Sequence, residues 1–95
     1  MVEVTIYTKA PDETGDCPFC HRAKAFLEEK RISYVEFILE PPDRQKLYDR
    51  LGLEDRERTV PQIILTDDDG EEMRIGGFTE LNRSGIESLF RNQTK

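Results

Sequence analysis

The N-terminal third of the chain changes from a two-residue to a helical period of apolar side chains. Apolar and more polar residues alternate over 2–7, the pattern of a half-buried strand. After a polar loop over 9–16, apolar residues recur at i, i+4, i+7 and i+8, which predicts a helix from Pro18 to about Lys30, and proline suits a first helical position. These apolar positions are Val2, Val4 and Ile6, then Phe19, Ala23, Phe26 and Leu27.

The middle of the chain repeats this strand and helix order. Residues 33–39 are rich in aromatic and branched side chains and predict a second strand. Asp43 is suited to cap a second helix, with Leu47 and Leu51 on one face and Gly52 as its end. Because a helix joins the first two strands, we expect them to be parallel.

The C-terminal third predicts a hairpin followed by a last helix. Residues 61–66 and 71–75 flank a turn at Asp67–Gly70, and a turn that ends in Asp-Gly is typical of an antiparallel hairpin. Thr79 is suited to cap the last helix, whose apolar residues are Leu81, Ile86, Leu89 and Phe90. The order β-α-β-α-β-β-α predicts an α/β fold with a mixed four-stranded sheet flanked by helices.

Length and charge narrow the function classes. The 95 residues predict one domain over 1–95. Twenty acidic against 14 basic residues give a net charge of −6, which argues against a nucleic-acid-binding protein. No apolar run approaches the length of a membrane span, and the first residues show no signal-peptide pattern, so we expect a cytoplasmic protein.

The two cysteines are the first residues that indicate a chemistry. Cys17 and Cys20 are separated by two residues, and a disulfide closing so short a loop would contribute little stability. A zinc site with His21 would need a carboxylate as fourth ligand, and we expect no metal. Two buried unpaired cysteines are another alternative. The Cys-x-x-Cys spacing at a strand-to-helix junction favours a redox pair, with Cys17 at the helix cap as the nucleophile and Cys20 as the resolving thiol.

If the two cysteines are a redox pair, two further segments are candidates for a substrate-binding site. The predicted third strand begins at Thr59-Val60-Pro61. One interpretation is ordinary strand initiation, because proline suits the first residue of a strand. The other is that Pro61 is cis and presents the Val60 backbone to an extended substrate. The segment Gly76–Glu80 also allows two interpretations. It is typical of a turn before a helix, and its two glycines would also let the backbone of the segment approach a ligand closely.

Together these motifs resemble the glutaredoxin family. The matching segments, from Val4 to about Phe90, are Tyr7-Thr8-Lys9, Cys17-Pro18-Phe19-Cys20, Thr59-Val60-Pro61 and Gly76-Gly77-Phe78-Thr79-Glu80-Leu81. The resemblance implies a thioredoxin-like three-layer fold, a cis Pro61 and exchange of thiols and disulfides that depends on glutathione. The glutathione-binding residues that it implies are Lys9, Phe19, Arg58, Thr59, Val60, Pro61, Gly77, Phe78, Thr79 and Glu80. Arg58 would bind the glycine carboxylate, and Thr79 with Glu80 the γ-glutamyl carboxylate.

Two departures from the family pattern affect these expectations. Seven residues, 10–16, separate Lys9 from Cys17 where the family usually has a much shorter run, so the contact of Lys9 with glutathione is in question. Phe19 stands where tyrosine is commoner. The lengthened loop is similar to that of phage-encoded members of the family.

The function expected from the resemblance is that of a monomeric enzyme. It would reduce protein disulfides and glutathione mixed disulfides, with ribonucleotide reductase as a family-level partner. Two alternatives stay open. One is a thioredoxin-like carrier served by a flavoprotein reductase. The other is a scaffold in which Cys17 and glutathione hold a [2Fe–2S] cluster between two subunits.

Overall fold

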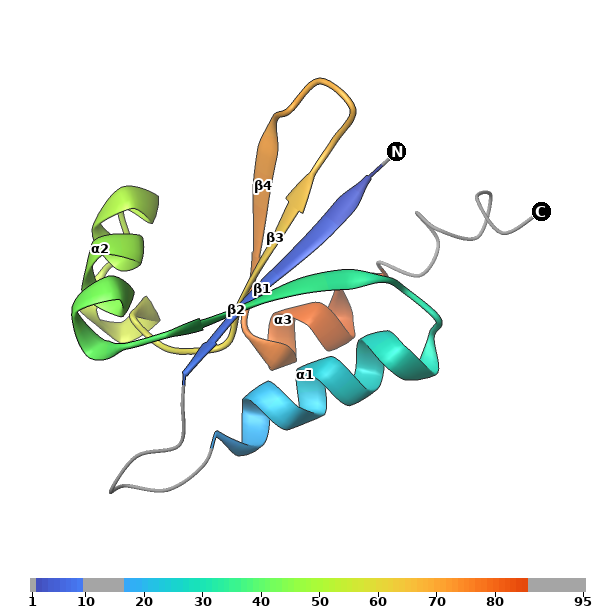
Figure 1. Cartoon of the computed structure of the whole chain (residues 1–95), viewed down its shortest axis with the longest axis horizontal. Helices are drawn as coiled ribbons and strands as arrows, with labels where there is room; N and C mark the ends of the chain where they lie inside the picture. Colours follow the sequence, from blue (N-terminus) through green and yellow to red (C-terminus); the bar gives the residue numbers. More distant parts are fainter. Residues whose placement is uncertain (1, 10–16, 86–95) are drawn as a thin grey trace.

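A computed structural model describes residues 2–9 and 17–85, and it has the element order that the sequence predicts (Figure 1). The elements are β1 (Glu3–Lys9), α1 (Pro18–Glu29), β2 (Tyr34–Leu39), α2 (Pro41–Leu51), the 3₁₀ helix η1 (Asp55–Glu57), β3 (Gln62–Thr66), β4 (Glu72–Gly76) and α3 (Phe78–Arg83). The 10–16 loop and the predicted apolar positions Ile86, Leu89 and Phe90 lie outside the described residues. Within the described part, no helix is long and apolar enough to cross a membrane.

The four strands form one mixed sheet in the order β2-β1-β3-β4. β1 and β2 are parallel, β1 and β3 are antiparallel, and β3 and β4 form the predicted antiparallel hairpin. The hairpin turn is held by Asp67, whose Oδ1 accepts hydrogen bonds from the backbone N–H groups of Asp69 (2.9 Å) and Glu71 (3.0 Å). The predicted strand directions and the turn are therefore confirmed.

The core lies between the sheet and the pair α1 and α3, which cover one side while α2 lies on the other (Figure 1). Alternate residues of the two central strands face these helices, as the period of two requires. The buried cluster comprises Val4, Ile6, Ala23, Leu27, Ile32, Ile63, Leu65 and Leu81. Phe19, which the helical period placed with Ala23 and Leu27, is 51% exposed instead, and the guanidinium of Arg22 lies 5.4 Å from the centre of its ring.

Two helices begin earlier than their predicted caps. α2 starts at Pro41 with Glu40 as its N-cap, so Asp43 lies in the first turn, because Pro41 and Pro42 already have the backbone angle of a first turn. α3 starts at Phe78 with Gly77 as its N-cap, and Thr79 is therefore inside the helix.

Two other boundaries concern Gly52 and Lys9. Gly52 ends α2 in the left-handed conformation (φ 67°), as predicted. Lys9 belongs to β1 rather than to the loop, because it pairs with Leu39 of β2.

The topology brings the chemical motifs to one edge of the sheet. β1 ends at Lys9 next to the loop that leads to Cys17, β3 begins directly after Pro61, and β4 ends at Gly76. Antiparallel pairing of β1 with β3 places Tyr7 opposite Gln62. Segments that are about 40 residues apart in the sequence therefore meet beside the start of α1.

Candidate active site

Cys17 and Cys20 form a disulfide at the start of α1, with their Cα atoms 5.2 Å apart. Cys17 is the N-cap residue, and its Sγ accepts a hydrogen bond from the backbone N–H of Cys20 at 3.2 Å. The unpaired N–H groups and the positive end of the dipole at a helix start favour the thiolate over the thiol. The redox pair and its place at the helix start are thus as the sequence predicts. Cys17 is 7% and Cys20 3% exposed, which follows the predicted order.

The segment before β3 lies directly against this disulfide. The Val60–Pro61 peptide bond is cis, as the family resemblance implied. The Sγ of Cys17 is 3.8 Å from the carbonyl oxygen of Val60, and because a disulfide sulfur carries no proton this is a packing contact. Backbone atoms of Val60 are therefore within reach of any group that is bonded to the Cys17 sulfur.

A groove of about 260 Å³ lies beside the cis proline. It is lined by eight of the ten predicted glutathione-binding residues: Phe19, Thr59, Val60, Pro61, Gly77, Phe78, Thr79 and Glu80. The fold thus brings together the start of α1, the segment before β3 and the segment after β4, which the sequence analysis predicted separately as parts of a site. A cavity of about 300 Å³ beside Val2 and Tyr34 contains no cysteine, so volume alone does not identify a site.

One wall of the groove depends on its glycines. Gly76 has φ of 117°, and a Cβ there would lie 2.8 Å from Oε1 of Glu80, so a larger residue cannot fit without movement. A Cβ on Gly77 would lie 3.5 Å from the carbonyl oxygen of Pro61, which shows how closely the two walls approach. The Glu80 carboxylate accepts a hydrogen bond from the backbone N–H of Gly77 at 3.0 Å and fixes the corner between β4 and α3.

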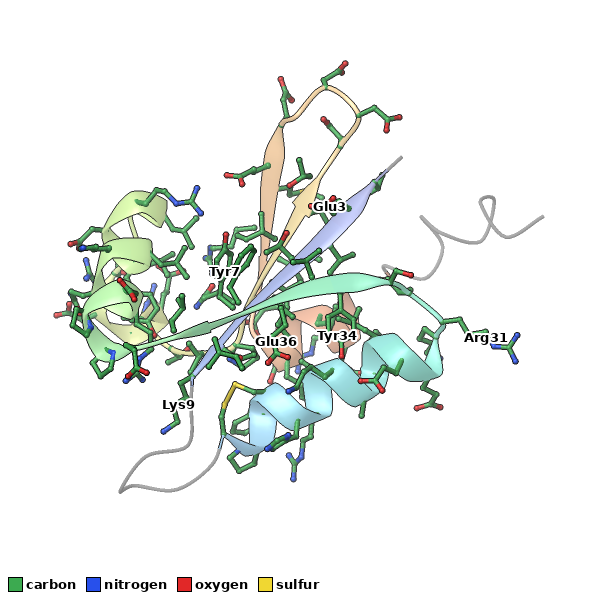
Figure 2. All side chains as sticks on the ribbon, viewed as in Figure 1. Glu3, Tyr7, Lys9, Arg31, Tyr34 and Glu36 are labelled. Carbon is green, nitrogen blue, oxygen red and sulfur yellow. A yellow bond between two sulfur atoms is a disulfide. The ribbon has the colours of Figure 1, made fainter. Side chains whose placement is uncertain are left out.

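The other two predicted residues do not line the groove. Arg58 donates from Nε to the carbonyl oxygen of Leu53 (3.1 Å) and from Nη1 to Oδ1 of Asp49 (2.9 Å), so its guanidinium holds α2 and η1 together. Lys9 lies at the end of β1, at the same end of the sheet as the disulfide (Figure 2). Their contact with glutathione stays a prediction.

A polar cluster between α1 and the sheet was missed by the sequence analysis. Glu36 of β2 accepts hydrogen bonds from the Thr8 hydroxyl (2.7 Å) and from Nζ of Lys24 (3.1 Å), and its side chain lies on the α1 side of β2 (Figure 2). Desolvation raises the pKa of Glu36. The hydrogen bonds from Thr8 and Lys24 and the positive charges of Lys24 and His21 outweigh it and lower the pKa.

A sequence signal for this cluster did exist. Glu36 interrupts an otherwise apolar strand, and Lys24 follows Cys20 by one helical turn. Lys24 thus brings the cluster to within one helical turn of Cys20.

Titratable side chains do not gather into a metal site in the part of the chain that the structure describes. Among those residues there is no group of three or more His, Cys, Asp or Glu side chains placed to hold a metal ion.

The fold and site together define a class of protein. A thioredoxin-like α/β fold with a Cys-x-x-Cys disulfide at a helix start, beside a cis proline, is the arrangement of a thiol–disulfide oxidoreductase. A family model described as Glutaredoxin matches residues 4–69, about two thirds of the chain. The chain belongs to the glutaredoxin family.

Individual relatives agree with this assignment. The chain is similar to glutaredoxin 3 of Escherichia coli (strain K12), with 36% identity over 97 residues, 96% of this chain and 100% of the relative. It is 30% identical to glutaredoxin 1 of Rickettsia conorii over 97% of this chain and 84% of the relative. Among solved structures, glutaredoxin 1 from Francisella tularensis, complexed with cacodylate, matches with a TM-score of 0.67 and 35% identity over 94% of this chain and 98% of that one. The solution structure of glutaredoxin from Brucella melitensis matches with a TM-score of 0.60 and 26% identity, covering 97% and 87%.

Proposed function

We propose that this oxidoreductase uses glutathione, and that it reduces glutathione mixed disulfides as well as protein disulfides. The observation that carries the proposal is the groove, whose lining joins Phe19, Thr59–Pro61 and Gly77–Glu80 directly beside the Cys17 sulfur. A tripeptide with a central cysteine fits this arrangement, because its sulfur must lie at Cys17 while its two ends extend along backbone on either side.

The proposed reaction begins with the reduced protein. The Cys17 thiolate attacks the glutathione sulfur of a mixed disulfide, a new S–S bond forms, and the substrate protein leaves as a thiolate. A second glutathione thiolate then attacks that sulfur, releasing oxidised glutathione and restoring the Cys17 thiolate. With a protein disulfide, Cys20 attacks the mixed disulfide between Cys17 and the substrate instead, giving the Cys17–Cys20 disulfide and the reduced substrate.

Local groups must supply the recognition of charge, because the net charge of −6 gives no long-range attraction to an anionic tripeptide. In the lining of the groove the one charged side chain is Glu80, which suits the γ-glutamyl ammonium. We assign the γ-glutamyl carboxylate to the Gly77–Glu80 backbone, and the glycine carboxylate to Lys9 and Arg58, the two cations among the predicted glutathione-binding residues.

The test compares two reducing systems on one substrate. A peptide carrying a glutathione mixed disulfide is supplied with glutathione, glutathione reductase and NADPH, or with thioredoxin reductase and NADPH. We expect turnover in the first system and little in the second. Turnover only with thioredoxin reductase would contradict the proposal and favour a thioredoxin-like carrier. Visible absorbance of protein purified without oxygen, lost together with iron on chelation, would favour the cluster scaffold.

A further inference from the structure

Gln62, the residue after the cis proline, forms hydrogen bonds to the backbone segment that leads into one wall of the groove. Its side chain is buried, with 1% of the residue exposed, although it is an amide at the start of a strand. Its Nε2 donates to the carbonyl oxygens of Glu57 (3.1 Å) and Thr59 (2.8 Å). Both donors of the amide are therefore used to fix the backbone that leads into Val60 and Pro61.

Arg74 of β4 completes a ring with Gln62 and Glu57. Its Nη1 donates to Oε1 of Gln62 at 3.3 Å, and its Nη2 donates to Oε2 of Glu57 at 2.9 Å. The side chains of Arg74 and Glu57 are 31% and 38% exposed, so this ion pair is better shielded from water than the Arg50–Glu72 pair further along β4 (49% and 46%). Glu57 takes part through both its side chain and its backbone, because its carboxylate accepts from Arg74 and its carbonyl oxygen accepts from Gln62.

The ring joins the two backbone segments that face each other across the groove. Glu57 lies two residues before Thr59 in one wall, and Arg74 lies three residues before Gly77, where the other wall begins. A pocket of about 360 Å³ between these residues shares Thr59 and Glu80 with the groove. The ring thus links the two walls, and the hydrogen bonds that form it involve neither Cys17 nor Cys20.

We propose that Gln62, Arg74 and Glu57 are positioning residues that preorganise the groove for the glutathione part of the substrate. This inference rests on the proposed function. A wall that is already ordered loses less conformational entropy when a ligand binds, so the ring lowers the Michaelis constant for the glutathione mixed disulfide. It acts on binding rather than on the thiol chemistry, because none of its atoms contacts the sulfurs.

The central test is the variant Arg74→Gln, which removes the ion pair but keeps a partly exposed polar side chain. We expect its KM for a glutathionylated peptide to rise about 5-fold, which corresponds to about 1 kcal/mol, with kcat changed by less than about 2-fold. The rate at which dithiothreitol reduces the Cys17–Cys20 disulfide should stay within about 2-fold of the unaltered protein, because this small dithiol needs no groove. Arg74→Lys keeps the charge beside Glu57 and should recover part of the lost affinity.

A matched control and a double variant separate positioning from general stability. Arg50→Gln also removes an arginine–glutamate pair between α2 and β4, at 3.1 Å, but far from the groove, and should leave KM unchanged. Because Arg74 and Glu57 act through one ring, the effects of Arg74→Gln and Glu57→Gln on KM should not add in the double variant.

Three results would overturn the proposal. One is an unchanged KM in Arg74→Gln. Another is a loss of kcat, dithiothreitol reduction and melting temperature together, which would indicate a purely structural role. If the unaltered protein turns over no glutathionylated peptide, the proposed function itself fails and the inference fails with it.

Discussion

The two ends of the β3–β4 hairpin differ sharply in how they use charge. At the groove end, Thr59–Pro61 and Gly77–Glu80 offer mostly backbone and neutral side chains, with Glu80 as the one charged residue among the groove-lining residues. At the turn, residues 67–72 carry five acidic side chains and one glycine. The same two strands thus join a nearly neutral groove to the most acidic stretch of the described chain.

The acidic turn is far enough from the groove for its charges to be screened there. Each strand has five residues, so the two ends lie roughly 17 Å apart at about 3.4 Å per residue. Exposed charges separated by more than roughly 8 Å are largely screened at physiological ionic strength. The acidic turn can therefore contribute to the net charge of −6 and to solubility without repelling an anionic ligand at the groove.

The largest effect is expected at the disulfide itself. Cys17→Ser should abolish exchange with every substrate, because serine cannot supply the attacking thiolate. Cys20→Ser should retain reduction of glutathione mixed disulfides and lose reduction of protein disulfides. Steady-state assays with one substrate of each kind check this. Equal inactivity of both variants towards a glutathionylated peptide would show that the two roles are wrongly assigned.

The next effect is expected at the corner between β4 and the groove. Gly76→Ala places a Cβ against the Glu80 carboxylate at a positive φ, so it should cost about 1–2 kcal/mol of unfolding free energy and raise KM for the mixed disulfide. Urea unfolding and steady-state kinetics measure the two effects. Gly70→Ala in the hairpin turn is the control, because its φ is 84° but a Cβ there meets no atom within 4 Å. A KM increase of the same size in both variants would contradict the assigned role of the corner.

A smaller effect is expected from the Glu36 cluster between α1 and the sheet. Because the fold lowers the pKa of Glu36, its stabilising contribution is present above the ordinary carboxyl pKa and is lost as the pH falls through the lower folded-state value. Glu36→Gln should therefore lose about 1 kcal/mol at neutral pH and show a shallower loss of stability in acid. Urea unfolding from pH 3 to pH 7 measures both. Identical acid slopes in the two proteins would remove the basis for this prediction.

The smallest effect is expected at the acidic turn. Asp69→Asn combined with Glu71→Gln leaves the Asp67 side chain that holds the turn and removes two exposed charges. At physiological salt, KM for the mixed disulfide should change by less than about 2-fold because of screening. The same assay at low salt should show a modest decrease in KM. A large change at physiological salt would mean that the turn acts on the groove.

The sequence by itself determined the features that depend on near neighbours along the chain. Pro18 after Cys17 begins α1 with the cysteine as its cap, Gly52 ends α2, and the Asp-Gly turn specifies the hairpin. Each of these needs only one residue's backbone preference or a hydrogen bond over a few residues. The groove residues Thr59–Pro61 and Gly77–Glu80 were predicted because a resemblance, rather than periodicity, nominated them.

Tertiary structure decided which strands pair and which hydrogen-bond partners the long polar side chains have, because these depend on segments that are distant in the sequence. Lys9 became part of β1 only because β2 pairs with it, and Arg58 turned to Asp49 and Leu53 because α2 lies within its reach. The ring of Glu57, Gln62 and Arg74 joins η1, β3 and β4, and no local pattern in any of them predicts it. A long polar side chain has several possible partners in the sequence, and only packing of the sheet and helices brings one of them within hydrogen-bond distance.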